Sequence, residues 1–453
     1  MLLSFYGDDF TGSTDVMESL ARAGVPAALF LDPPTTEQLA RFPAIEAVGV
    51  AGVGRSLSPA EMDDVLPPIF VRLRELGAPI VHYKVCSTFD SSPEIGSIGH
   101  AIDVGQQIFA SPFVPLVVGA PILGRYCVFG NLFARSGAES EVFRLDRHPT
   151  MRRHPITPMH ESDLRLHLAR QTSCKSGLLD VLHIVLPHEE ARGRLEALLR
   201  SGAEIVLFDV MTDEQLSAIG RLIWERASRE EPLFAAGSSG LEYALTAHWR
   251  AAGMLPAPPV FAAEKVEQIV VVSGSCSPVT EGQIAWAVEH GFAEIALQPE
   301  KFVNRADSGA YREQTVEVTL EHISQGRSVI LHTSRGPQDA RIDATRRQLR
   351  EHAPGASTAK MLGEAMGEIL RCIVEQSRLR RVAVTGGDTS GYVARAMGIE
   401  ALEMAAPMAP GSPLCHAHSA NPAVNGLEII FKGGQVGKVD LFGGVLRGAP
   451  ESS

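Results

Sequence analysis

Short apolar runs alternate with amphipathic stretches along most of the chain, which is the pattern of strands followed by helices. The run LLSFYG (2–7) predicts a strand, the apolar spacing within 16–23 predicts a helix, and 26–31 predicts the next strand. This opening is typical of a parallel sheet with crossover helices. In such sheets the loops at the carboxyl ends of the strands form the ligand crevice.

The same alternation continues to residue 236. Further strands are predicted at 47–53, 79–85, 116–120, 126–133, 181–187, 204–210 and 232–236, and helices at 59–76, from 96 onward, and at 160–170, 189–200 and 213–229. These elements predict a doubly wound sheet.

A break follows at 251–263, AAGMLPAPPVFAA, which has three prolines, no charge and no period. Beyond it strands are predicted at 268–272, 328–334, 382–384 and 427–431, helices at 279–289, 338–350 and 359–377, and a proline-punctuated loop at 406–415. We therefore expect an α/β protein of two doubly wound domains with mostly parallel sheets and an interdomain cleft. The first domain is expected to span 1–250, the linker 251–264 and the second domain 265–453.

Composition narrows the class of protein. The chain has 453 residues, 45% of them hydrophobic and 21% charged, with a formal net charge of −12. An acidic protein lacks the basic face that nucleic acid requires, and no apolar run approaches the length that spans a bilayer. The N-terminus has no basic region of the kind that begins a signal peptide, and the six cysteines are scattered without CxxC spacing. We expect a cytoplasmic protein with reduced thiols and no nucleic-acid or membrane partner, and a homodimer is left open.

Two acids, Asp8 and Asp9, lie in the loop GDDFTGSTD that follows the first strand. Paired carboxylates there can orient or deprotonate a substrate hydroxyl or bind a cation. The alternative is that they cap the following helix, and we favour a function for at least one.

A second polar turn, CSTFDSS (86–92), follows the strand at 79–85. Its hydroxyl and acid side chains suggest a sugar or polyol pocket, and a surface loop is the alternative. Lys84, one position inside the strand, could supply a cation for a carboxylate, and a solvated strand residue is the alternative. The candidate substrate-binding residues are Lys84, Ser87, Thr88 and Asp90.

The stretch RLDRHPTMRRHPITPM (144–159) is basic within an acidic chain, and its prolines exclude a helix. It could steer an acidic substrate, or it could be a solvated loop.

The segment VAVTGGDTSG (382–391) is a strand that turns through glycines into a helix start. Exposed N–H groups at the positive end of a helix dipole bind anions, most often phosphate. Asp388 could hold Mg²⁺ or act as a base, and Thr389 could touch phosphate oxygens or cap the helix. An ordinary strand–turn–helix connection is the alternative for this segment alone.

Two further strands of the second domain end in similar loops: SGSCS (273–277) and KGGQVG (432–437). Three such loops at strand ends predict a site for a nucleotide-sized polyanion. GxxxxGK[ST], the Rossmann fingerprint and the protein-kinase motifs are absent, which disfavours those three classes. The candidate nucleotide-binding residues are Ser273, Ser275, Gly386, Gly387, Asp388, Thr389 and Gly434.

With GDDFTGSTD, SGSCS, GGDTSG and KGGQVG in this order, the whole chain resembles the four-carbon acid sugar kinase family. The resemblance implies a sugar-acid-binding N-terminal domain, an ATP-binding C-terminal domain and phosphoryl transfer to a terminal hydroxyl. It also implies nucleotide contacts from Ser275, Gly386 to Thr389 and Gly434, and a sugar-side role for Asp8 and Asp9.

The turn at 86–92 differs from the corresponding segment of the threonate and erythronate kinases. Their segment is similar to DSTLRGN, where this chain has CSTFDSS. The acid becomes Cys86 and the arginine position becomes Asp90, which removes a bidentate clamp for carboxylate. CSTFDS and HPITPM are similar to the 3-oxo-tetronate kinase branch, but EIGSIGH (94–100) differs from its GNIGP. A branched acid, 3-oxo-isoapionate, is therefore a serious candidate beside 3-oxo-tetronate.

We expect an ATP- and Mg²⁺-dependent kinase in carbohydrate-acid catabolism, with Asp8, Asp9 and Asp388 as candidate catalytic residues and no metal ligand assigned. Positioning and charge neutralisation would supply most of the rate. The alternatives are an aldonate kinase of the threonate or erythronate type, a non-catalytic sensor of nucleotide and sugar acid, and a dehydrogenase.

Overall fold

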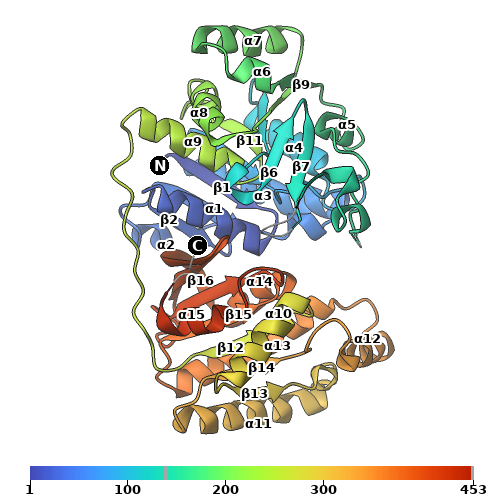
Figure 1. Cartoon of the computed structure of the whole chain (residues 1–453), viewed down its shortest axis with the longest axis vertical. Coiled ribbons are helices and arrows are strands. Elements are labelled where there is room, and N and C mark those ends of the chain that lie inside the picture. Colours follow the sequence, from blue (N-terminus) through green and yellow to red (C-terminus); the bar gives the residue numbers. More distant parts are fainter. Residues whose placement is uncertain (137–140, 155, 450–453) are drawn as a thin grey trace. The chain divides into compact units, whose positions relative to one another are not determined.

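Residue contacts in the computed structural model divide the chain into two compact units (Figure 1). The structure describes residues 1–136, 141–154 and 156–449. The first unit comprises Met1–Ala27 and Asp32–Pro259, and the second comprises Ala28–Leu31 and Val260–Ser453. The short segment Ala28–Leu31 thus packs with the second unit, an exchange that the domain boundaries expected from the sequence did not include.

The first unit is built on a parallel sheet with the strand order β3-β1-β4-β11-β5-β10-β9. Its inner strands are buried along their length, which explains their continuous apolar runs. The strands are β1 (Leu3–Gly7), β3 (Ala47–Ala51), β4 (Ile80–Lys84), β5 (Val114–Val117), β9 (Ser176–Leu179), β10 (Ile205–Phe208) and β11 (Leu233–Gly237).

Most helices of this unit lie between successive strands, as expected for crossover connections, and α9 follows the last strand of the unit. They are α1 (Phe10–Arg22), α2 (Thr36–Ala40), α3 (Pro59–Glu75), α4 (Ile98–Phe109), α5 (Leu164–Leu168), α6 (Val181–Ile184), α7 (His188–Arg200), α8 (Leu216–Trp224) and α9 (Gly240–Ala251). The sequence pattern had not predicted α9.

The strand predicted at 126–133 is wrong, because the chain reverses within it. β6 (Arg125–Val128) and β7 (Asn131–Arg135) form an antiparallel hairpin, and β8 (Val142–Arg144) completes a separate three-stranded sheet. Phe129 at the turn has a φ of 51°, and the buried Asp209 accepts hydrogen bonds from the N–H groups of Phe129 and Gly130. A distant carboxylate thus fixes a turn that local propensity does not indicate.

The strand predicted at 181–187 is also wrong, since this segment begins with helix α6. Asp180 caps the helix by accepting hydrogen bonds from the N–H groups of Leu182 and His183. The preceding residues form β9 instead. Periodicity alone does not separate a strand from a short helix in an apolar run, and here the aspartate cap selects the helix.

The second unit has the strand order β13-β14-β12-β15-β18-β17-β16-β2. The pairings from β13 to β18 are parallel, and those from β18 to β2 are antiparallel. The strands are β2 (Ala27–Phe30), β12 (Val270–Ser273), β13 (Ala293–Ala296), β14 (Val329–His332), β15 (Arg381–Thr385), β16 (Ile399–Ala409), β17 (Ser412–Ser419) and β18 (Glu428–Lys432).

The loop predicted at 406–415 is wrong, because it falls within the β16–β17 hairpin. Its prolines are accommodated near the hairpin end, where the β16–β17 register shifts between Ala406 and Ala409. Proline lacks the N–H that a regular ladder requires, so it is tolerated at such irregular positions.

The helices of the second unit are α10 (Pro278–Glu289), α11 (Arg305–Ser324), α12 (Ala340–His352), α13 (Thr358–Gln376), α14 (Gly387–Ala396) and α15 (Leu441–Arg447). The sequence pattern had predicted neither β13 nor α11. Within the described parts of the chain, no helix combines the length and the apolar character that crossing a membrane requires.

Candidate active site

The acidic loop of the first unit lies at the carboxyl end of β1, between the ends of two neighbouring strands. The Asp8 N–H donates to the carbonyl of Lys84 (2.8 Å), which ends β4. The Asp8 carbonyl accepts from the N–H of Arg55 (3.0 Å), which follows β3. These backbone bonds bring three strand ends together around the two aspartates.

Asp9 is occupied by structural contacts. As the N-cap of α1 it accepts from the Gly12 N–H (2.9 Å) and the Thr11 hydroxyl (3.2 Å), and it forms an ion pair with Arg55 (3.3 Å). Burial favours a higher pKa for Asp9, but Arg55, Lys84 and these hydrogen bonds outweigh burial and lower the pKa. Asp9 is therefore a fixed negative charge rather than a proton acceptor.

Asp8 differs sharply from its neighbour. Its side chain is buried (3% exposed), and its Oδ1 has no hydrogen-bond partner among the described residues. Burial and the adjacent Asp9 charge raise the pKa of Asp8 to about 8, against the opposing effects of Arg55 and Lys84. A carboxylate with an open oxygen and a pKa near neutrality suits a general base.

Lys84 supplies a buried cation beside these acids. Burial favours a lower pKa for Lys84, but Asp15, Asp9 and Asp8 outweigh it and raise the pKa, so the ammonium stays charged. Gly12 makes room for this group, because a Cβ on Gly12 would lie 2.3 Å from the Lys84 Nζ.

The turn after β4 carries the other predicted substrate-binding residues. The Thr88 hydroxyl donates to Asp90 Oδ1 (2.5 Å) and lies 3.0 Å from the Cys86 sulfur, while Ser87 is half-buried on the same turn. Burial and the Asp90 charge raise the pKa of Cys86 to about 11, so its thiol stays protonated. Phe89 is buried with a φ of 55°, a strained conformation of the kind found at functional turns.

Sequence reasoning missed Arg55 and Asp15. Asp9, Cys86, Asp8 and Asp90 all lie close enough to Arg55 to influence it, and together they raise its pKa despite burial. Arg55 follows β3, which pairs with β1. The signal that could have found it is its place directly after the strand predicted at 47–53, since the loops that follow parallel strands form the ligand crevice.

The basic stretch at 144–159 forms two short 3₁₀ helices, Leu145–Arg147 and Met151–Arg153. Arg144 pairs with Asp146, and Arg147, Arg152 and Arg153 are exposed. This arrangement favours the solvated-loop alternative.

The predicted glycine loops of the second unit follow β12, β15 and β18, three adjacent parallel strands. The Gly274 N–H donates to the Thr385 carbonyl (2.9 Å), and the Gly386 N–H donates to the Lys432 carbonyl (3.0 Å). Since parallel strands end at one edge, the three loops come together there.

The packing of these loops requires glycine at two positions. Gly386 has a φ of 129°, and a Cβ on it would lie 2.6 Å from the Thr389 hydroxyl oxygen and 3.3 Å from the Ser275 nitrogen. A Cβ on Gly434 would lie 2.7 Å from the Ser275 hydroxyl oxygen. The structure therefore brings Ser275, Gly386, Thr389 and Gly434 into contact.

Helix α14 begins at Gly387, so the predicted loop residues form its first turn. The hydroxyls of Thr389 and Ser390 both donate to the Gly386 carbonyl (3.1 and 2.8 Å), and Asp388 is exposed. The positive end of the helix therefore lies beside the glycine loops.

The buried Lys432 supports the loops from behind. Its ammonium donates to the Thr280 hydroxyl (3.0 Å) and to Gln283 Oε1 (2.7 Å). The Thr280 hydroxyl in turn donates to the Gly434 carbonyl (2.9 Å) and lies within hydrogen-bond distance of the Ser275 hydroxyl (3.0 Å), while the buried Ser273 hydroxyl accepts a long bond (3.4 Å) from the Ser275 N–H. These bonds tie the loop after β12 to the loop after β18.

In the described part of the chain, no group of three or more His, Cys, Asp or Glu side chains is placed to bind a metal ion. Mg²⁺ commonly binds through one or two carboxylates together with substrate phosphates. The exposed Asp388 beside the glycine loops fits that limited donor set.

Two known domain families match most of the chain. The sugar-binding N-terminal domain matches residues 3–245, and the nucleotide-binding C-terminal domain matches 270–442. The fold resembles a solved structure from Salmonella typhimurium LT2 (TM-score 0.77, 25% identity, 98% of each chain). It also resembles one from Haemophilus influenzae (TM-score 0.72, 22% identity, 97% of this chain and 98% of that one).

The chain is similar over nearly its whole length to several curated proteins, among them two kinases. The 3-oxo-isoapionate kinase of Paraburkholderia graminis is 48% identical, covering 99% of this chain and 94% of the relative. The 3-oxo-tetronate kinase of Pseudomonas savastanoi pv. phaseolicola is 30% identical, covering 98% and 97%. The chain therefore belongs to the four-carbon acid sugar kinase family.

Proposed function

We propose that this protein is a kinase that transfers the γ-phosphoryl group of ATP to a terminal hydroxyl of a small oxo sugar acid in carbohydrate-acid catabolism. Two matched domains, one sugar-binding and one nucleotide-binding, and full-length similarity to kinases of oxo sugar acids support this assignment.

The branched acid 3-oxo-isoapionate is the preferred substrate within this proposal, and 3-oxo-tetronate is the second candidate. Identity is 48% to the 3-oxo-isoapionate kinase and 30% to the 3-oxo-tetronate kinase, at nearly equal coverage. The turn at Cys86–Asp90 departs from the threonate and erythronate pattern, which argues against a simple aldonate.

The state of Asp8 carries the mechanistic proposal. Of the two adjacent acids, Asp9 is occupied by its helix cap and by Arg55, while Asp8 has a pKa of about 8 and a buried oxygen with no hydrogen-bond partner in the described part of the chain. Ionised Asp8 accepts the proton of the substrate hydroxyl as that oxygen bonds to the γ-phosphorus. The bond from the γ-phosphorus to the bridging oxygen breaks, and ADP leaves.

Two cations of the same site, the buried Lys84 and the half-buried Arg55, would attract the carboxylate of a substrate acid. Lys84 is a point charge, and Arg55 offers a planar fork suited to a carboxylate. Both already balance Asp9, so the bound substrate carboxylate would share these cations with it.

In the second unit, N–H groups of the glycine loops and of the first turn of α14 would hold the phosphates. When bound with ATP, Mg²⁺ would neutralise charge on the phosphates, and the exposed Asp388 would supply its protein carboxylate. The loops after β12, β15 and β18 are already in contact with one another, so phosphate binding requires little reorganisation.

An ADP-release assay across 3-oxo-isoapionate, 3-oxo-tetronate, threonate and erythronate tests the proposal. We expect the highest kcat/KM with 3-oxo-isoapionate. Threonate or erythronate as the best substrate would contradict the preference, and tight ATP binding without turnover of any acid would indicate a sensor. Protection against thermal unfolding by NADH rather than ATP would indicate a dehydrogenase.

A further inference from the structure

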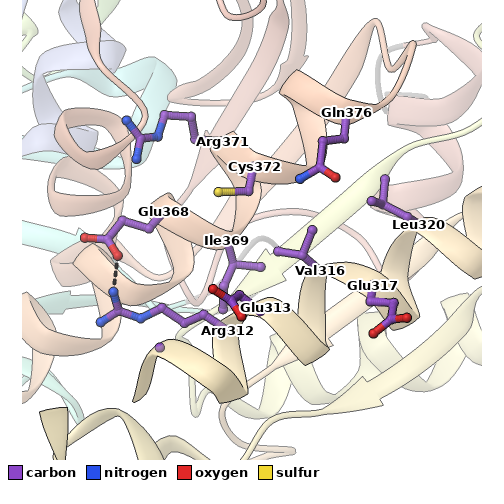
Figure 2. Close-up of a pocket in the computed structure, with 11 residues that line it drawn as sticks. Arg312, Glu313, Val316, Glu317, Leu320, Glu368, Ile369, Arg371, Cys372 and Gln376 are labelled. Carbon is purple, nitrogen blue, oxygen red and sulfur yellow. Dashed lines mark hydrogen bonds and ion pairs between the residues drawn. The ribbon is translucent and has the colours of Figure 1, made fainter. Parts of the chain in front are cut away.

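A cavity of about 490 Å³ lies between helices α11 and α13 of the second unit (Figure 2). Three glutamates and two arginines line it, and Arg312 forms an ion pair with Glu368 there. Because this lining favours no ligand of one charge, we assign the cavity no ligand.

Ser91 lies buried in the turn after β4 of the first unit and joins three hydrogen bonds. Its hydroxyl donates to the Phe89 carbonyl (3.2 Å) and accepts from the side-chain amide of Gln171 (3.0 Å). His167 Nε2 lies 2.8 Å from the same hydroxyl. Burial lowers the pKa of His167 to about 4, so its imidazole is neutral. It donates from Nε2, because the single proton of the Ser91 hydroxyl goes to Phe89.

These contacts hold a turn that is strained at its centre. Phe89 has a φ of 55°, a conformation that a bulky side chain rarely adopts. The His167 ring packs edge-on against the Phe89 ring, with 5.9 Å between their centroids. His167 and Gln171, which lie in and after α5, thus give the turn a support that its own residues do not supply.

Gln171 also fixes the start of α4. Its Oε1 accepts from the Gly99 N–H (3.1 Å) and from the Ser97 hydroxyl (3.4 Å). A Cβ on Gly99 would lie 2.6 Å from the Cβ of Gln171 and 2.8 Å from its carbonyl carbon, so glycine permits this approach. One side chain therefore links the turn at 86–92, which differs from the threonate and erythronate pattern, to the segment at 94–100, which differs from the 3-oxo-tetronate pattern.

Both segments border the acid site of the first unit. Gly96 has a φ of 61°, and a Cβ on it would lie 2.6 Å from the Arg55 carbonyl oxygen. Asp90 lies close enough to Asp8 to contribute to its raised pKa. The Asp90 carboxylate accepts from Thr88 through Oδ1 and has further acceptor positions for the hydroxyls of a sugar acid.

We propose that His167 and Gln171 are positioning residues for the sugar acid. Acting through Ser91, they hold the turn that presents Thr88 and Asp90 to the substrate hydroxyls. Through its second contact, with the start of α4, Gln171 also contributes to the choice between 3-oxo-isoapionate and 3-oxo-tetronate. The role in substrate choice rests on the proposed function, whereas the support of the turn is measurable without turnover.

A matched pair of variants at His167 separates the hydrogen bond from the ring. His167→Phe keeps a ring against Phe89 but loses the donor to Ser91, whereas His167→Gln keeps an amide donor and loses the ring. With 3-oxo-isoapionate as substrate, His167→Phe should raise KM for the acid about tenfold and leave kcat and KM for ATP within about twofold of the wild type. His167→Gln should keep KM for the acid within about threefold of the wild type.

Gln171→Leu tests the second support, and Thr172→Val is its control. The Thr172 hydroxyl donates to Asp103 (2.5 Å), so the control removes a hydrogen bond of the same segment that goes to α4 rather than to the turn. Gln171→Leu should raise KM for the acid at least about tenfold and lower the preference in kcat/KM for 3-oxo-isoapionate over 3-oxo-tetronate at least about threefold. Thr172→Val should change neither.

Alkylation by iodoacetamide, mapped by mass spectrometry, reports the turn directly. Cys86 is half-buried on the turn, and the exposed Cys276 of the second unit is an internal reference. The rate at Cys86 relative to Cys276 should rise at least about threefold in His167→Phe and in Gln171→Leu, because a released turn opens more often. The ratio should stay unchanged in Thr172→Val.

An unchanged rate ratio in both His167→Phe and Gln171→Leu would overturn the proposal. A rise in KM for ATP equal to that for the acid would also overturn it, because it would indicate a general loss of stability. If the wild type phosphorylated no sugar acid, the proposed function would fail. An increased ratio would then still support the hold of the two residues on the turn, and an unchanged one would still contradict it.

Discussion

The two candidate sites differ in the chemical groups that form them. The first unit gathers charged side chains at buried strand ends, and their mutual influence moves the pKa values of Asp8 and Asp9 in opposite directions. The second unit presents backbone N–H groups and hydroxyls, and its buried Lys432 is directed at Thr280 and Gln283.

This difference matches the functions that we propose for the two sites. A polyphosphate brings its own charge, so a site for it needs donors and space, which glycine turns and a helix start supply. A hydroxyl has no charge and must lose a proton, so its site needs a base whose pKa lies near the working pH. Burial beside a like charge gives Asp8 that property at a cost in stability.

The largest expected effect separates the two aspartates of the first unit. Asp8→Asn should lower kcat by about 10²- to 10⁴-fold, because it removes the proposed base but keeps the side-chain shape. Steady-state kinetics and ATP titration should show that nucleotide affinity is retained. A kcat equal to that of the wild type would remove Asp8 from the reaction.

The next effect concerns the exposed acid of the second unit. Asp388→Asn should lower kcat about 10²-fold and leave sugar-acid binding nearly unchanged, because it weakens charge neutralisation at the phosphates. Kinetics over a range of Mg²⁺ concentrations, with binding of the acid measured separately, check this. Wild-type turnover in the ATP-coupled assay would contradict it.

Substitution of Gly386, at the turn into α14, tests whether backbone N–H groups of this turn bind the nucleotide. Gly386→Ala should raise KM for ATP at least about tenfold, since the added Cβ meets Thr389 and Ser275. Gly326→Ala is the control, because Gly326 also has a positive φ (79°) but no atom lies within 4 Å of the Cβ position. A KM for ATP equal to that of Gly326→Ala would contradict a role for the turn at Gly386 in nucleotide binding.

A smaller effect is expected at the cation that the sequence did not reveal. Arg55→Lys keeps the charge but loses the planar fork, so KM for the sugar acid should rise about tenfold with little change in KM for ATP. Parallel titrations of both substrates measure the two constants. An equal rise in both would indicate a general structural defect.

The dependence on pH tests the raised pKa of Asp8 directly. The pKa of Asp8 is higher in the folded protein than its ordinary 3.8, so its stabilising contribution is complete below about pH 4 and is lost as pH rises through about 8. The Tm of Asp8→Asn relative to the wild type should therefore increase over this interval. Wild-type kcat/KM should rise toward pH 8, and a pH-independent Tm difference would contradict the raised pKa.

Local patterns predicted much of the fold. Apolar runs followed by Gly, Ser or Asp predicted the bounds of β1, β12, β15 and β18 closely. This worked because the burial of a strand and the turn after it both depend on residues that are neighbours in the sequence. The same local patterns placed Ser275, Gly386 and Gly434 in loops that each follow a strand. Because the carboxyl ends of parallel strands meet at one edge of a sheet, these loops were expected to converge on one ligand. The failures arose where a distant group decides the outcome.

Two corrections show this dependence. Asp209 accepts hydrogen bonds from the turn between β6 and β7 and from the N–H of Val181 in α6, so one buried carboxylate organises two segments predicted as strands. The β16–β17 hairpin likewise overrides prolines that locally favour a loop, because both strands pair along their length within the sheet of the second unit.

By itself the sequence determined the α/β class, the order of most elements, the glycine loops and the presence of two acids after the first strand. Only the tertiary structure decided which of those acids is free to act, because helix capping by Asp9, the approach of Arg55 and the burial of Asp8 all depend on residues brought together by folding. A pKa depends on every charge and on the water excluded around the group, and neither is a property of the group's neighbours in sequence.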